Sequence, residues 1–244
     1  MFVGVGTLIN VAAILIGSSL GVIAGARITK KSQSLITDVL GLITALGAAS
    51  ALSALWSPIF QAALPKSSSL LVILASMLIG GLIGSALSLE TRLDAFGENL
   101  RNRFKASQDS PFVEGFVSAS LLFVIGPLAI LGSVSDGMSQ GIDQLILKSS
   151  LDFFAAMAFA STLGWGVAAS AIPVALYQGF WTVIGFAAGS VLAQYQIDAM
   201  TICGGLMLVG IALRLLDIKK IPVANLLPAL VIAPTIATVL HILR

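Results

Sequence analysis

The ionisable residues that could do chemistry lie inside apolar stretches of the chain. Lys148 and Asp152 stand four residues apart at the start of a long apolar run, which places them on one face of a helix. Two interpretations are open. The pair neutralises itself, with Lys148 reaching towards lipid headgroups, or Asp152 is a cation or proton site or a counter-charge for an anionic solute.

A second pair of opposite charges is widely separated in the sequence. Glu114 lies about one turn inside the end of an apolar run, and Arg214 lies at a similar depth in a later run. Because an unpaired charge is costly at that depth, we predict that Glu114 and Arg214 form a structural ion pair.

The other candidates are polar groups and breaks within apolar runs. Gly126-Pro127 removes a backbone hydrogen bond and kinks or breaks its helix, which is either a packing kink or a source of free carbonyls for a cation or polar solute. We expect Asn10 and Gln178 to bond across helices, and Asp136-Gly137 to form a turn in a loop. The candidate solute- or ion-binding residues are Asn10, Gly126, Pro127, Ser133, Asp136, Lys148, Asp152, Gln178 and Asn225.

Soluble-enzyme motifs are missing from the sequence. The chain has one histidine, His241, and one cysteine, Cys203, so it can form neither an internal disulfide nor a thiol metal cluster. It contains no Walker loop, no G-x-S-x-G and no dinucleotide-binding glycine pattern after a strand. We therefore predict no enzymatic activity, no cofactor and no metal site, and we expect Cys203 to be a small packing residue.

Composition places these polar residues in lipid. The chain has 244 residues, of which 57% are hydrophobic and only 10% are charged, and its mean hydropathy is +1.03. Soluble domains carry roughly 25% charged residues, and one soluble core of this length could not hide so much apolar surface. The basic residues are scattered, without a basic helix that carries aromatics, which argues against a nucleic-acid partner.

Eight apolar runs of about 20 residues predict an all-α polytopic membrane protein. The first run lacks a basic leader and a cleavage site, so we interpret it as a retained span. Between the third and fourth runs, LETRLDAFGENLRNRFKA has helical periodicity, which predicts an amphipathic helix on the membrane surface or a solvated connector. The spans are expected at about residues 5–26, 35–56, 69–89, 112–132, 147–171, 174–194, 199–216 and 222–243, with a turn at 170–173.

The basic residues predict the orientation of these spans. With the N-terminus outside, ten basic residues fall on the inside and three on the outside, a strong positive-inside bias. Both termini then lie outside the inner (plasma) membrane. The inside set is Arg27, Lys30, Lys31, Arg92, Arg101, Arg103, Lys105, Arg214, Lys219 and Lys220, and the outside set is Lys66, Lys148 and Arg244.

The first and last three spans share glycine patterns. LIGSSLG, with Gly17 and Gly21, aligns with VIGFAAG, and in that register Asn10 falls on Gln178. These spans run in opposite directions, so the pattern indicates an inverted repeat, or else only the glycines common in packed membrane helices. We predict one membrane domain over 1–244: a helix triplet (1–89), a cytoplasmic amphipathic helix (90–106), a central helix pair (111–171) and a second triplet (172–244).

Several strings occur together that resemble a known family: GTLIN, GPLAILGS followed by DG, KSSLD, YQG, GGLMLVGIALRLLDIKK and IPVANLLPAL. They resemble, over essentially the whole chain, the bacterial membrane proteins grouped as domain of unknown function 554, of YdfK type. The resemblance implies a multi-span inner-membrane protein of about this size, and it implies no activity.

The sequence favours a secondary transporter of a small solute or ion, working by alternating access. A channel is the first alternative. The second is a non-transporting scaffold in the bilayer, in which the glycine faces Gly17-xxx-Gly21 and Gly80-xxx-Gly84 bind copies of the chain or another membrane protein.

Overall fold

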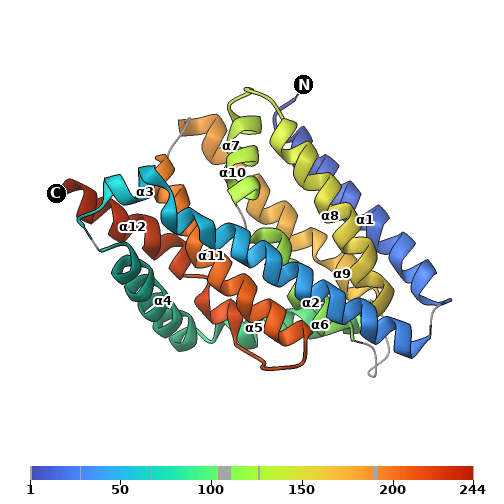
Figure 1. Cartoon of the computed structure of the whole chain (residues 1–244). Coiled ribbons are helices and arrows are strands. Elements are labelled where there is room, and N and C mark those ends of the chain that lie inside the picture. Colours follow the sequence, from blue (N-terminus) through green and yellow to red (C-terminus); the bar gives the residue numbers. More distant parts are fainter. Residues whose placement is uncertain are drawn as a thin grey trace. The chain divides into compact units, whose positions relative to one another are not determined.

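The structure is a computed structural model that describes residues 2–27, 29–66, 68–103, 111–125, 127–188 and 192–243 (Figure 1). Within these ranges the chain is all-helical, with no strand, which confirms the predicted fold class. The helices are α1 (Val5–Gly25), α2 (Lys30–Leu52), η1 (Ser53–Trp56), α3 (Pro58–Ala63), α4 (Ser69–Ala86), α5 (Leu89–Arg103), α6 (Phe112–Val124), α7 (Pro127–Gly137), α8 (Asp143–Leu163), α9 (Gly166–Ala169), α10 (Ala171–Ala188), α11 (Gln194–Leu215), η2 (Val223–Leu226) and α12 (Ala229–Ile242).

Seven helical segments in the described ranges are long and apolar enough to cross a membrane, and the bent pair α6–α7 makes up to eight. Their outer faces carry large apolar side chains. On α10, for example, Leu176, Val183 and Phe186 are 71%, 65% and 71% exposed. Exposed apolar stripes of this extent require lipid rather than water as their solvent.

The chain forms two compact units, and each takes segments from several parts of the sequence. Unit 1 contains Met1–Leu40, Leu93–Val124 and Leu128–Val191, and unit 2 contains Gly41–Arg92, Ile125–Pro127 and Leu192–Arg244. The division of the sequence into triplets, a central pair and an amphipathic helix stays a prediction.

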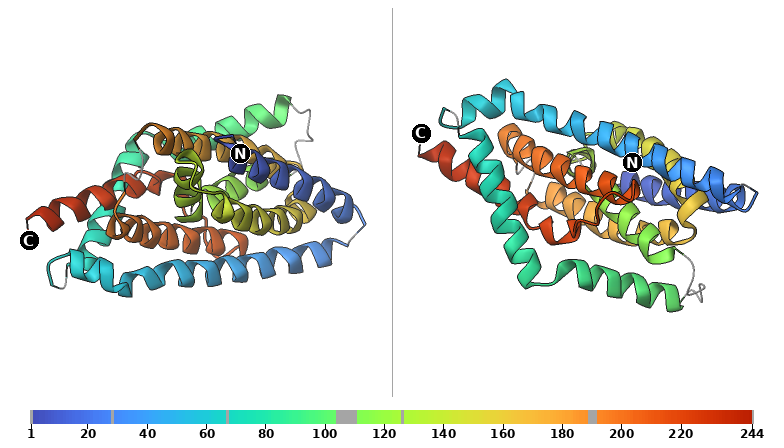
Figure 2. Two further views of the ribbon diagram at one scale, coloured as in Figure 1. Left: turned by 90° about the horizontal axis from the view of Figure 1, so that it is seen from above. Right: turned by 60° about the horizontal axis from the view of Figure 1, so that its bottom comes forward.

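In unit 1, α1 and α8 pack side by side along most of their lengths (Figure 2). A Cβ atom added to Gly17, Gly21 or Gly25 would meet the backbone carbonyl oxygens of Phe153, Met157 and Ser161 respectively. Glycine is therefore required for this close approach. Because both sets of residue numbers increase together, α1 and α8 run in the same direction.

The fourth span is broken, as the Gly126-Pro127 pair predicts. Helices α6 and α7 are bent by 63° relative to each other, and α7 begins at Pro127. Gly126 itself lies outside the described residues. The start of α6 contacts Gly166, just beyond the end of α8, while Gly132 of α7 contacts Leu145 near the start of α8. The broken pair therefore runs antiparallel to α8.

The predicted boundary between the fifth and sixth spans is wrong. Helix α8 ends at Leu163, eight residues before the expected end at residue 171 (171 − 163), and Gly164 follows with φ of 71°. With its ψ of −154°, this backbone conformation is open essentially to glycine alone and cannot continue the helix. Pro173 lies in the first turn of α10, where proline costs no helical hydrogen bond, so the expected turn at 170–173 is helical apart from Ser170.

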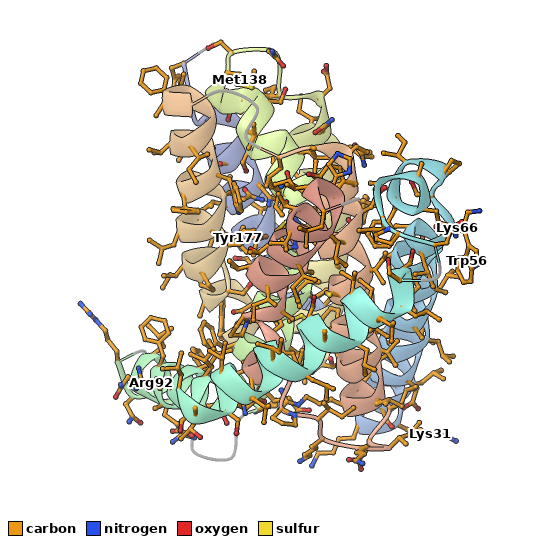
Figure 3. The ribbon with its side chains drawn as sticks, turned by 90° about the vertical axis from the view of Figure 1, so that its left-hand side faces the viewer. Lys31, Trp56, Lys66, Arg92, Met138 and Tyr177 are labelled. Carbon is orange, nitrogen blue, oxygen red and sulfur yellow. The ribbon has the colours of Figure 1, made fainter. Side chains whose placement is uncertain are left out.

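In unit 2, α4 and α12 pack closely and run antiparallel. A Cβ on Gly80 would meet the backbone of Ala229, and one on Gly84 would meet the carbonyl of Asn225. Trp56 and Lys66, also in unit 2, lie near each other around the short α3 segment (Figure 3). The glycine faces at Gly17 and Gly80 thus pack within the chain, which corrects the expectation that they bind another copy.

Candidate functional site

Three of the predicted site residues meet at the carboxylate of Asp152. The Nζ atom of Lys148 donates to Asp152 Oδ2 over 2.7 Å, and the Nδ2 atom of Asn10 donates to the same oxygen over 2.9 Å. Lys148, Asp152 and Asn10 are 7%, 6% and 0% exposed. The predicted i,i+4 ion pair is therefore present, and α1 supplies an amide that the pair alone did not predict.

Helix α10 contributes polar residues near Asn10, in addition to those of α1 and α8. Thr182 Oγ1 lies 3.5 Å from Thr7 Oγ1 of α1. Further along α1, Val11 and Leu15 line a pocket with four residues near the start of α10, so the two helices run antiparallel. These four are Ala171, Ile172, Ala175 and Leu176. Asn10 follows Thr7 by one turn and Gln178 precedes Thr182 by one turn, which puts both amides at the same level. We call Thr7, Asn10, Lys148, Asp152, Gln178 and Thr182 the polar cluster.

The polar cluster is incompletely hydrogen-bonded. Gln178 is fully buried, yet neither its Oε1 nor its Nε2 atom has a partner among the described residues, and Asn10 Oδ1 has none either. The expected bond between the two amides is thus not formed, because Asn10 donates to Asp152 instead. Buried amide atoms without partners cost free energy and are uncommon in native proteins, so these three atoms are candidates to bind a ligand.

Asp136 lies in the last turn of α7 rather than in a loop, which corrects the sequence interpretation. Its carboxylate accepts from the backbone N–H groups of Gly4 at 3.2 Å and Gly6 at 2.9 Å, and the residue is 3% exposed. The first N–H groups of a helix have no partner within the helix and attract negative charge. Asp136 therefore fixes the end of α7 to the start of α1; Met138, labelled in Figure 3, directly follows α7.

Ser133 lies one turn before Asp136 on α7, between α8 and α10. Its neighbour Gly132 contacts Leu145 of α8, and Gly137 contacts the backbone of Thr182 on α10. The Ser133 hydroxyl is fully buried and has no partner among the described residues. It is a further polar group close to the helices that hold the polar cluster. Pro127, another predicted residue of α7, is the first residue of that helix.

The predicted pair of Glu114 and Arg214 is replaced by another. Arg214 donates to Glu90 Oε1 over 2.5 Å in unit 2, while Glu114 is exposed in the first turn of α6. Glu90 Oε2 accepts from the N–H of Ala224 at 2.7 Å, and the N–H of Glu90 donates to Asn225 Oδ1 at 2.9 Å. Asn225, predicted as a solute ligand, thus belongs to a bonded junction between α5 and η2.

A separate apolar pocket of about 860 Å³ lies in unit 1. It is lined by apolar side chains of α1, α6, α9 and α10, among them Val11, Leu15, Phe112 and Ala175. It holds none of the polar groups that could select a solute, so we place the candidate site at the polar cluster. Gln178 of the polar cluster directly follows Tyr177 on α10, and Tyr177 is labelled in Figure 3.

Long lipid-facing helices around buried polar groups define a polytopic α-helical membrane protein. Comparison of sequences agrees: the model of the family described as "Protein of unknown function (DUF554)" matches residues 5–238, and the chain belongs to this family. The chain is 32% identical over 236 residues to the "Uncharacterized membrane protein YdfK" of Bacillus subtilis (strain 168), covering 97% of this chain and 96% of the relative. It is 31% identical over 236 residues to the "Uncharacterized protein YqgA" of Escherichia coli (strain K12), covering 94% of each. No solved structure matches the chain.

Proposed function

We propose that the chain is a secondary transporter of a small solute or ion in the bacterial inner membrane. The observation that carries the proposal is the polar cluster: an ion pair and two amides, almost fully buried among apolar helices, with three amide atoms unbonded among the described residues. A network held only for stability would be expected to satisfy its amides. An incompletely hydrogen-bonded network at membrane depth is suited to reversible binding of a ligand.

The packing in unit 1 supports eight spans in this proposal. Parallel membrane helices begin on the same side, so an odd number of crossings must lie between α1 and α8. Helices α2 and α4 supply two crossings, and the broken pair α6–α7 supplies the third. With the positive-inside bias, this arrangement favours both termini outside.

The helix pairs also suit the inverted repeat, which remains a proposal. The repeat would relate α1 to α10 and α4 to α12, and the structure packs α1 against α10 and α4 against α12. Asn10 and Gln178, equivalent in the repeat, stand at the same level of the polar cluster. Binding where repeat equivalents meet is a common plan of secondary transporters.

Reconstitution into liposomes separates this proposal from its alternatives. We expect saturable uptake and counterflow of one component from a mixture of isotope-labelled amino acids, polyols and urea, with loss of uptake in Asp152→Asn. Unitary currents without saturable counterflow would favour a channel. If neither uptake nor current is observed, the scaffold alternative is favoured. Full uptake activity of Asp152→Asn would show that Asp152 is not part of the binding site.

A further inference from the structure

We propose that the polar cluster binds a small monovalent cation, with Na⁺ as the probe, and that this cation displaces Lys148 from Asp152. The inference rests on the proposed transporter function and assigns the coupled ion to the same site. Three observations carry it: the balance of buried charge in unit 1, the unbonded amide oxygens of Asn10 and Gln178, and the place of Lys148 on α8, bonded to Asp152 and one turn after Leu145.

The buried charges of unit 1 do not balance. Among its described residues, the buried charged side chains are Asp136, Lys148 and Asp152, which gives a formal charge of 1 − 2 = −1. Buried charges are costly unless they are paired. The N-terminus of α1 contributes about half a positive charge at Asp136, which leaves the set negative. One monovalent cation would balance the formal charge of −1, whereas a divalent cation would exceed it.

The unbonded atoms include the oxygen ligands that such a cation needs. Asn10 Nδ2 donates to Asp152, so Asn10 Oδ1, on the same amide, lies beside that carboxylate. Gln178 adds a second amide oxygen without a partner among the described residues. Hard cations take carboxylate and amide oxygens as ligands. The described residues hold no group of three or more His, Cys, Asp or Glu that suits a metal ion, so one carboxylate with amides favours a monovalent cation.

Lys148 occupies the position that the cation would take. Its ammonium lies 2.7 Å from Asp152 Oδ2, the oxygen that also accepts from Asn10. One turn earlier on α8 is Leu145, which packs against Gly6 together with the carboxylate of Asp136. Lysine is a point charge on a flexible stem. It can therefore turn from Asp152 towards Asp136 when a cation enters, so that each carboxylate faces one positive charge.

The test is Na⁺-dependent thermal unfolding of the purified full chain, with choline chloride holding the ionic strength constant. We expect NaCl to raise the melting temperature saturably, because a ligand that binds the folded form stabilises it. Lys148→Met should lower the half-maximal Na⁺ concentration by about tenfold, since the cation then has no ammonium to displace. Asp152→Asn should lose the response.

The matched control is Asp198→Asn on α11 of unit 2, because Asp198 is also 6% exposed and should not affect the Na⁺ response. If Asp152→Asn does not fold, Gln178→Met should raise the half-maximal Na⁺ concentration instead. Equal melting in NaCl and choline chloride for both the wild type and Lys148→Met would overturn the inference, as would a response that survives Asp152→Asn. An equal response to KCl would support a monovalent site, whereas one to CaCl₂ alone would overturn it.

Parallel uptake assays distinguish this inference from the function on which it rests. Na⁺ stabilisation without uptake of any labelled solute, or of ²²Na⁺, would keep the cation site and remove the transport proposal. Saturable uptake that does not depend on Na⁺, with no stabilisation by it, would keep transport and end the inference.

Discussion

Each unit of the chain holds a network of charged and amide groups, and the two networks differ in how completely they are bonded. In unit 2, both carboxylate oxygens of Glu90 have partners, Arg214 and the N–H of Ala224, and Asn225 accepts from the Glu90 backbone. In unit 1, Asp152 collects two donors on one oxygen while Gln178 has no partner among the described residues.

This difference separates a structural role from a binding role. A satisfied network fixes the elements that it joins, here α5, α11 and η2, and gains nothing from a ligand. In an unsatisfied network, the buried polar atoms without partners lower the stability of the fold until water or a ligand bonds to them. Substitutions in the two networks should therefore have different effects on stability and on function.

Breaking the satisfied network should give the largest loss of stability. Glu90→Ala leaves Arg214, whose side chain is 14% exposed, without its carboxylate. We expect a loss of about 3 kcal/mol in the free energy of unfolding, the low end for removing one partner of a buried ion pair. Denaturant titration in detergent measures it. Glu114→Ala is the control, and an equal loss in Glu114→Ala would contradict the assignment of Glu90 as the partner of Arg214.

Disrupting the glycine contacts between α1 and α8, which position the polar cluster, should give the second-largest loss of stability. Gly17→Ala places a methyl group against the carbonyl of Phe153, which must move α1 away from α8. We expect a loss of about 1–3 kcal/mol, as for other overpacked sites, together with reduced uptake. Gly179→Ala on α10 is the control, because a Cβ there meets nothing within 4 Å. Unchanged stability in Gly17→Ala would show that the contact is not tight.

The smallest effects should have opposite signs in the two networks. Gln178→Met removes a buried amide without partners and should raise stability by about 1 kcal/mol while it impairs uptake. Asn225→Ala removes the acceptor of the Glu90 N–H and should lower stability by about 1 kcal/mol. Melting temperatures of both variants, measured together, check this. Destabilisation by Gln178→Met would mean that its amide is bonded after all.

Periodicity and hydropathy predicted the features that depend on neighbours along the chain. The Lys148–Asp152 pair follows from i,i+4 spacing, and the break of the fourth span follows from the missing N–H of proline. The end of α8 was missed because Gly164 lies inside a continuous apolar run, where hydropathy contains no signal for a turn.

The long-range polar contacts could not be predicted in this way. Glu90 lies on the charged face of an amphipathic helix, and its partner Arg214 is 124 residues away. Asp136 was expected to be a loop residue because Asp-Gly is a common turn sequence. Its actual role depends on the free N–H groups of Gly4 and Gly6, about 130 residues earlier. Only tertiary packing decides which orphan donor meets which carboxylate.

Thiol accessibility at position 178 tests the central claim, that the polar cluster is a ligand site open to water in part of a transport cycle. Cys203, the single native cysteine, is fully buried on α11, and Cys203→Ala provides a cysteine-free background. In that background the Gln178→Cys thiol should react with a small, membrane-impermeant thiol reagent, whereas Cys203 in the wild type should not. A Gln178→Cys thiol as unreactive as native Cys203, in protein that remains folded and membrane-inserted, would contradict the account.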